Sequence, residues 1–127
     1  MDRMTYEQVR AMLLSCGERI IRNEPYLTRV DSAIGDGDHG IGMKNGMQAA
    51  RRYLETAENE QNVYALYANM ASAMQAAMGG ASGMIFSTLF AGKAAEHAPA
   101  SAITPKELAE QMRDGLQAIQ ELGHAEV

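Results

Sequence analysis

The chain has little cysteine and no cluster of basic residues, and both shortages exclude classes of protein. Its one cysteine, Cys16, cannot form an internal disulfide, and its place on the apolar side of a predicted helix favours a buried structural thiol over a nucleophile. The 127 residues carry a net charge of -5 without a Lys/Arg cluster, which argues against binding to nucleic-acid phosphates. Any phosphate bound by this chain would therefore need a metal ion.

Long apolar runs and a leader segment are also missing from the sequence. No stretch approaches the length needed to cross a bilayer, and the first residues lack the charged-then-apolar pattern of a signal peptide. We therefore expect a cytoplasmic protein without a membrane span. A chain of 127 residues has room for one domain at most, so residues 1–127 are expected to form a single domain.

Alternation of apolar and polar residues, as in a β-strand, never extends beyond a few residues. Helical periodicity of apolar residues recurs along the chain and predicts an all-α fold of about five antiparallel amphipathic helices. Capping boxes at Thr5–Gln8 and Thr104–Glu107 mark the starts of the first and last helices, and Pro25 is expected to stop the first. Alanine and the ten methionines fall mostly at core positions. The expected helices cover about 5–24, 39–55, 62–78, 82–97 and 105–123.

The most specialised segment is Gly35-Asp36-Gly37-Asp38-His39-Gly40, with Asp31 upstream of its first aspartate. Glycine permits the tight turn that brings short carboxylates together, and carboxylate oxygens are suitable ligands for a hard divalent cation. Without a cation, the three negative charges would repel one another. The segment therefore predicts a metal-binding loop directly before a helix.

Three other kinds of loop share features with this segment. It matches the glycine pattern of dinucleotide-binding loops, but no convincing buried strand precedes it and its acids would repel a bare pyrophosphate. An EF-hand starting at Asp36 would have Gly40 at its fifth position and Met47 at its twelfth, where a glutamate belongs. A solvated acidic turn that caps the next helix stays open, because Asp and Gly are ordinary turn residues.

A second informative segment, Gly79-Gly80-Ala81-Ser82-Gly83, lies between two predicted helices. A glycine-rich helix start offers unpaired backbone N–H groups and the positive end of the helix dipole, which together suit a phosphate. Taken alone, the pentapeptide is better explained by a C-cap at Gly79 and an N-cap at Ser82. Together with the acidic segment, it predicts a site for a metal-bound nucleotide.

These two segments, in this order, resemble the L subunit of dihydroxyacetone kinase. Tyr26-Leu27-Thr28, Met43 and the run 85–90 fit as well, so the resemblance spans essentially the whole chain. It implies an antiparallel barrel of eight amphipathic helices that holds ADP or ATP at one end through two Mg²⁺ ions. By this match the expected Mg²⁺ ligands are Asp31, Asp36 and Asp38, and the residues expected to bind the nucleotide are His39, Gly80, Ala81 and Ser82.

In that family the domain either binds ATP as a substrate or keeps ADP as a coenzyme, which a phosphoprotein of the phosphotransferase system recharges. A separate K subunit holds the sugar, dihydroxyacetone or a related small ketose such as erythrulose. The resemblance therefore implies a kinase subunit that supplies the phosphoryl group and needs no catalytic nucleophile. The alternatives are a non-catalytic module that binds Mg-nucleotide or a partner, and a metal-dependent phosphate hydrolase.

Members of the family continue well past the segment where this sequence stops, 123–127. Five helices cannot close an eight-helix barrel, so we expect a domain that is incomplete on its C-terminal side relative to the family. Its inner apolar surface of Met, Leu and Ile would then be exposed, which predicts self-association or pairing with a complementary fragment.

Overall fold

The computed structural model describes residues 2–34 and 39–123, and the side chains of residues 2–29 and 40–122. Within these ranges the chain folds into six α-helices, a short 3₁₀ helix and two short strands. This confirms the all-α fold expected from the periodicity, with one helix more than anticipated. None of the described helices has the length and apolar character needed to span a membrane.

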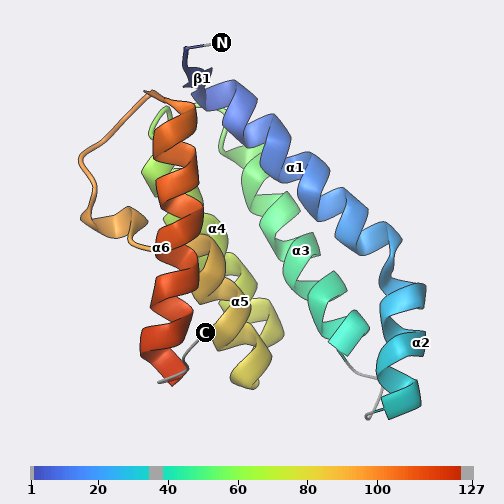
Figure 1. Ribbon diagram of the computed structural model, residues 1–127. Helices are drawn as coiled ribbons and strands as arrows, with labels where there is room; N and C mark the ends of the chain where they lie inside the picture. Colours follow the sequence, from blue (N-terminus) through green and yellow to red (C-terminus); the bar gives the residue numbers. More distant parts are fainter. Residues whose placement is uncertain (1, 35–38, 124–127) are drawn as a thin grey trace.

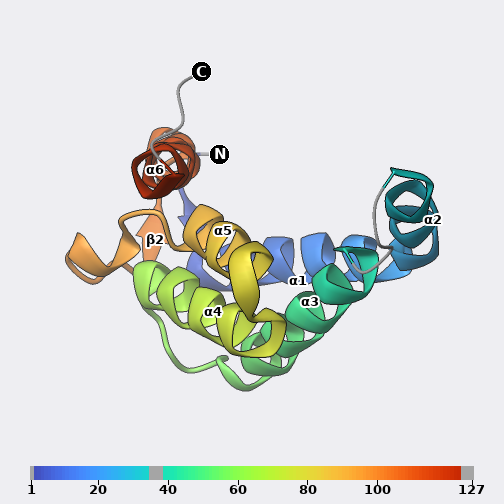
Figure 2. The ribbon, with the colours of Figure 1, turned by 90° about the horizontal axis from the view of Figure 1, so that it is seen from below.

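The helices lie alongside one another in an open assembly (Figure 1). Seen from below, α2 and α6 occupy opposite edges, and α1, α3, α4 and α5 lie between them (Figure 2). In chain order the elements are β1 (Met4–Thr5), α1 (Tyr6–Arg22), α2 (Glu24–Ile34), α3 (His39–Thr56), α4 (Val63–Met78), α5 (Gly80–Ala91), η1 (Ala94–Glu96), β2 (Ala102–Ile103) and α6 (Pro105–Gly123).

The core lies where α1, α3 and α4 meet. Methionine fills much of it, because an unbranched, flexible side chain adapts to irregular gaps between helices. Burying one side chain of this size stabilises a fold by about 1.5–3 kcal/mol. The largest fully buried side chains are Tyr6 and Val9 of α1, Met47 and Leu54 of α3, Val63, Leu66, Met70 and Met74 of α4, and Ile103 of β2. These contacts hold α3 between α1 and α4.

Helix α2 is the element that the periodicity did not predict. Helix α1 ends at Arg22 with Asn23 as its C-cap, and Pro25 lies in the first turn of α2. Proline is tolerated there because the N–H that it lacks would have no partner inside the helix. The chain therefore turns at Asn23, where the expected stop at Pro25 is instead the start of a second helix.

Helix α5 starts earlier and ends earlier than the helix expected over 82–97. It begins at Gly80 and ends before Gly92, whose φ of 50° is favourable only for glycine. Gly79 is at once the C-cap of α4 and the N-cap of α5, so the prediction of a C-cap there is confirmed. The prediction of an N-cap at Ser82 is wrong, because Ser82 lies inside the first turn of α5.

The end of the assembly that carries the strands, at the top of Figure 1, is closed by hydrogen bonds. Strands β1 and β2 pair in antiparallel register. The buried Arg10 side chain of α1 donates from Nε to Leu54 O at 2.6 Å and from Nη2 to Glu55 O at 3.4 Å. The Tyr6 hydroxyl donates to Ala57 O. These bonds satisfy carbonyl groups where α3 ends, which a helix cannot satisfy by itself.

Both predicted capping boxes are formed at this same end. The Thr5 hydroxyl accepts from Gln8 N at 3.1 Å, and the Gln8 side chain accepts from Thr5 N at 2.9 Å. The Thr104 hydroxyl accepts from Glu107 N at 3.1 Å, and Glu107 Oε1 accepts from Thr104 N at 2.8 Å. The hydrogen bonds from Thr104 lower the pKa of the Glu107 carboxyl below its ordinary value. Side chains therefore fix the starts of α1 and α6.

Candidate functional site

Both informative segments adjoin helix ends at the opposite, lower end of the assembly. In Figure 1 the last turn of α2, the first turn of α3 and the junction of α4 with α5 all lie there. Helix α2 ends at Ile34 and α3 begins at His39, while α4 ends at Met78 and α5 begins at Gly80. The helix ends that flank the acidic segment and the glycine segment thus share one end of the fold.

The junction between α4 and α5 is a glycine turn open to solvent. Gly79 has φ 65° and ψ 178°, and Gly80 follows with φ 59°. Such positive φ values favour glycine, because a side chain would be strained there. A Cβ built on either residue meets nothing within 4 Å, and both residues are exposed, as are Ala81 and Ser82. A ligand can therefore approach this backbone closely.

The first turn of α5 presents hydrogen-bond donors that have no partners among the residues the structure describes. Its first helical bond runs from Gly83 N to Gly79 O at 2.9 Å, so the N–H groups of Gly80, Ala81 and Ser82 have no acceptor inside the helix. No side chain caps them, and the Ser82 hydroxyl bonds to nothing in the described part of the chain. Backbone donors and a hydroxyl at the positive end of a helix dipole can bind a phosphate group.

The start of α3 is packed tightly against α2. A Cβ built on Gly40 would lie 2.5 Å from Thr28 Oγ1, 2.7 Å from Thr28 N and 3.0 Å from Glu24 O. Two of these atoms are helix backbone and cannot move aside, so only glycine permits the approach. The Thr28 hydroxyl is buried and has no hydrogen-bond partner among the residues that the structure describes. The contact sets the separation of the two helices that the acidic segment connects.

The structure places some of the predicted site residues and leaves others untested. Asp31 lies in the last turn of α2, and His39 is the first residue of α3. Asp36 and Asp38 lie outside the described residues. Within residues 2–34 and 39–123, no three His, Cys, Asp or Glu side chains gather where they could hold a metal ion. The Mg²⁺ ligand set therefore stays a prediction.

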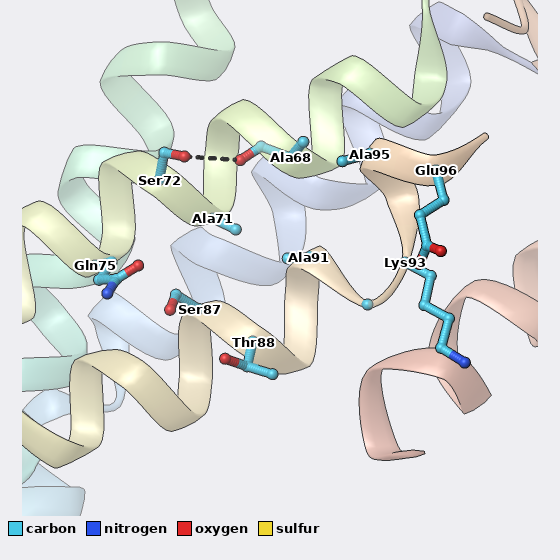
Figure 3. Close-up of a pocket in the computed structure, with 11 residues that line it drawn as sticks. Ala68, Ala71, Ser72, Gln75, Ser87, Thr88, Ala91, Lys93, Ala95 and Glu96 are labelled. Atoms are coloured by element: carbon cyan, nitrogen blue, oxygen red, sulfur yellow. Dashed lines mark hydrogen bonds between the residues drawn. The ribbon is translucent and has the colours of Figure 1, made fainter. Parts of the chain in front are cut away.

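A pocket of about 300 Å³ lies between α4, α5 and η1 (Figure 3). Two of its hydroxyls are bonded to their own helices, because Ser72 Oγ donates to Ala68 O and Ser87 Oγ to Met84 O, each at 3.2 Å. Much of the remaining lining is alanine, and Lys93 at its rim reaches toward α6. The N–H groups in the first turn of α5 lack acceptors inside the helix, whereas these two hydroxyls already have partners, so we favour the first turn of α5 as the ligand site.

A second, apolar cavity of about 350 Å³ opens between α1, α4, α5 and α6. Burial raises the pKa of Tyr67 in its wall to about 12, so this hydroxyl stays protonated at neutral pH. Cys16 lies in the same wall and is half-buried, so it is more exposed than the buried thiol expected from the sequence. Met112, which lines this cavity, is 66% exposed, and Leu116, also on α6, is 52% exposed. The predicted exposed apolar surface is thus present among the described residues.

Sequence reasoning had not assigned a role to Thr28 or to the packing of Gly40. Thr28 precedes Asp31 by three residues, and both lie in α2. The spacing was readable in the sequence, but only once Pro25 is recognised as a helix start rather than a helix stop.

The profile of the DAK2 domain matches residues 33–127, which is most of the chain. This chain belongs to the DAK2 domain family. The match includes the acidic segment and the glycine turn, so the family expected from these two segments is confirmed.

Curated relatives of this DAK2 chain include bacterial kinase subunits. It is 36% identical over 110 residues to the PTS-dependent dihydroxyacetone kinase ADP-binding subunit DhaL of Lactococcus lactis, covering 87% of this chain and 54% of the relative. The PEP-dependent counterpart of Escherichia coli is 31% identical over 119 residues, with 94% and 56% covered. The L-erythrulose kinase of Pectobacterium atrosepticum is 37% identical over 79 residues, with 61% and 13% covered. The chain spans about half the length of the two DhaL subunits.

Proposed function

We propose that this chain is a nucleotide-binding domain that holds ADP or ATP at the lower end of its helices and serves as the phosphoryl-transfer subunit of a small-ketose kinase. The observation that carries the proposal is the solvent-open helix start at Gly80, Ala81 and Ser82, on the same end of the fold as the helices that flank the acidic segment. The names of the DhaL relatives, described as ADP-binding subunits, point to the same ligand.

Each proposed site residue has a role that suits its chemistry. Asp31, Asp36 and Asp38 hold Mg²⁺, with two ions expected from the resemblance, because hard divalent cations prefer carboxylate oxygens. His39 lies beside the nucleotide phosphates. The turn of Gly80, Ala81 and Ser82 binds phosphate oxygens through its N–H groups and hydroxyl, and the open space at the glycine Cβ positions fits an approaching phosphate.

The chain's own contribution is to bind and orient, without a covalent step on a protein side chain. When bound, Mg-nucleotide supplies the phosphoryl group and offsets the charge that develops during transfer. The α5 helix dipole and its donors stabilise negative charge on the phosphates at a fixed position. None of these roles requires a nucleophile from this chain.

The acceptor and the donor come from partners in this proposal. A K subunit presents dihydroxyacetone or a related ketose such as erythrulose, which agrees with the kinases named among the relatives. A phosphoprotein of the phosphotransferase system is the proposed source of the phosphoryl group, in line with the name of the Lactococcus relative. Phosphate transfer to dihydroxyacetone in the presence of both partners is the activity to measure.

The alternative is a non-catalytic module that binds Mg-nucleotide or a partner. This alternative stays open because the chain covers only about half of the length of each DhaL subunit. Binding of Mg-ADP without phosphate transfer, with every partner present, would support the module. Transfer above the rate of the partners alone would support the kinase subunit.

The decisive experiment compares the parent chain with Asp36→Asn by calorimetric titration of ADP in the presence of Mg²⁺. Loss of one metal ligand should weaken Mg-ADP binding by about a hundredfold, since even groups outside the coordination sphere change metal affinity by 10–100-fold. Far-ultraviolet circular dichroism should show the same helicity for both chains. Equal affinities would contradict the proposed metal site.

Self-association through the exposed apolar surface is also part of the proposal. Large side chains such as Met112 and Leu116 on α6 and Met84 and Ile85 on α5 are exposed, and apolar surface of this kind is unfavourable in water. Light scattering after size exclusion should show a concentration-dependent dimer, and Met112→Glu should shift it to monomer. A monomeric parent chain at high concentration would contradict self-association.

A further inference from the structure

A glycine-lined notch at the lower end of the fold holds the side chain of Met78. Met78 is the last residue of α4, directly before Gly79. A Cβ built on Gly46 of α3 would overlap Met78 Sδ and would lie 2.6 Å from Met78 Cγ. The Met78 side chain therefore occupies the space that any larger residue at position 46 would need.

Gly83 of α5 forms the other wall of the notch. A Cβ built on Gly83 would lie 3.2 Å from Met78 Cβ, which is tighter than most contacts of this kind, and 3.4 Å from the backbone carbon Met78 C, which is an ordinary contact. Both Gly46 and Gly83 are buried. One side chain thus contacts α3 and α5 at positions where neither helix has a side chain of its own.

The position of this contact links the two parts of the proposed site. Gly46 lies seven residues after His39, which is about 10 Å along an α-helix. On its other side, Met78 is two residues before Gly80, the first residue of α5. The helix that follows the acidic segment and the phosphate-binding turn are therefore joined through one half-buried side chain, which packs against the core.

We propose that Met78, seated between Gly46 and Gly83, is a positioning residue that sets the distance between the start of α3 and the glycine turn, and thereby the affinity for Mg-nucleotide. The inference rests on the proposed function, because the two segments must bind one ligand for their separation to matter. A packed core transmits such a shift, since close-packed side chains leave no free volume to absorb it.

The test adds a methyl group to the notch and measures Mg-ADP binding by calorimetry. Gly46→Ala should bind Mg-ADP about tenfold more weakly, because overpacking a contact forces the helices apart. Gly42→Ala is the matched control, since it lies on the same helix and its new methyl meets nothing within 4 Å. It should bind within about twofold of the parent chain, as expected for a substitution without new contacts.

A second substitution distinguishes positioning from a general loss of stability. In Gly46→Ala/Met78→Ala the shortened side chain makes room for the new methyl group, so affinity should recover to within about threefold of the parent, as coupled neighbours do in a double-mutant cycle. Met78→Ala alone, which leaves the notch unfilled, should bind several-fold more weakly than the parent. Only samples that are fully folded by circular dichroism are compared.

The outcomes separate this inference from the proposed function. Parent-like affinity in folded Gly46→Ala, together with weak binding by Asp36→Asn, would overturn the positioning role and leave the proposed function standing. Absence of recovery in the double variant would also overturn it, because the overlap with Met78 would not be the cause of the loss. Failure of the parent chain to bind Mg-ADP at all would overturn both.

Discussion

At the upper end of the assembly, a hydroxyl at a helix start is bonded within the protein, whereas a similar hydroxyl at the lower end has no partner in the described part of the chain. Thr104 accepts from Glu107 N and caps α6, whereas Ser82 stands in the first turn of α5 and bonds to nothing that the structure describes. A hydroxyl group therefore contributes to stability at one end and stays available to a ligand at the other. A donor or acceptor that is already hydrogen-bonded within the protein is not available to bind a ligand.

The two ends also differ in how helices are brought together. At the upper end, the long Arg10 side chain bridges α1 to the end of α3 through carbonyl groups. At the lower end, two positions of α3 are glycines without side chains. The backbone of α2 approaches Gly40 directly, and the Met78 side chain approaches Gly46. We infer that contacts at the upper end mainly stabilise the fold, and that contacts at the lower end mainly fix the geometry of the proposed ligand site.

The largest expected effect is on stability, at the upper end. Arg10→Met keeps an apolar stem but leaves Glu55 O without its donor from Arg10, and Leu54 O keeps only the bond from Ala57 N at 3.2 Å. The free energy of unfolding, measured in urea, should fall by about 2 kcal/mol, because an acceptor that loses its partner inside a protein costs about 1–3 kcal/mol. Mg-ADP affinity of the folded variant should stay unchanged. A tenfold loss of affinity with unchanged stability would reverse the assignment of the two ends.

Gly40→Ala, at the lower end, should have a smaller effect, and this effect should be on Mg-ADP affinity rather than on stability. The new methyl group would press on Thr28 N and Glu24 O, so α2 and α3 must separate. Mg-ADP affinity should fall about tenfold, which corresponds to the lower part of the 1–3 kcal/mol range for overpacking. Gly42→Ala again serves as the control on the same helix. Calorimetry would contradict the account if both variants bound equally well.

The hydroxyls of Thr104 and Ser82 allow the most direct comparison of the two ends. Thr104→Ala should lower the free energy of unfolding by about 1 kcal/mol, the usual value of an N-cap, without changing Mg-ADP affinity. Ser82→Ala should leave unfolding unchanged and weaken Mg-ADP binding several-fold, because the hydroxyl has no structural bond to lose. Urea denaturation and calorimetry on both variants give the four values. Equal effects of the two substitutions on stability would remove the distinction.

The smallest expected effect depends on pH. Thr104 lowers the pKa of Glu107 below the ordinary value of 4.5, so the ionised carboxylate stabilises the fold above this pH. That contribution is lost as the pH falls below 4.5 and through the lowered pKa. Glu107→Gln, which cannot ionise, should be less stable than the parent at pH 7, and the difference should shrink in acid. A difference that grows in acid would contradict this capping interaction.

Local signals predicted the upper end of the fold well and the lower end only in part. The capping boxes of Thr5 and Thr104 depend on neighbouring residues, and the structure has both. The start of α3 at His39 was also expected from its apolar pattern. By contrast, α2 was missed because Pro25 can either stop a helix or start one, and only packing against α3 decides between these outcomes.

The candidate site shows the same limit. Gly79 was predicted as a C-cap, but its second role as the N-cap of α5 depends on how closely α5 folds back on α4. The notch around Met78 unites residues 46, 78 and 83, and no local pattern connects positions so far apart. Acidic and glycine-rich segments can be recognised in a sequence as candidate binding sites. The glycines that set the distances between helices are recognised only in the three-dimensional structure.

The central claim is that the lower end of the helices binds nucleotide through a divalent cation. Its most direct test is a calorimetric titration of ADP into the parent chain, first with Mg²⁺ present and then with excess chelator. The account predicts saturable binding with Mg²⁺ and its loss when the cation is removed. No binding by the folded chain with Mg²⁺, or equal binding after chelation, would contradict it.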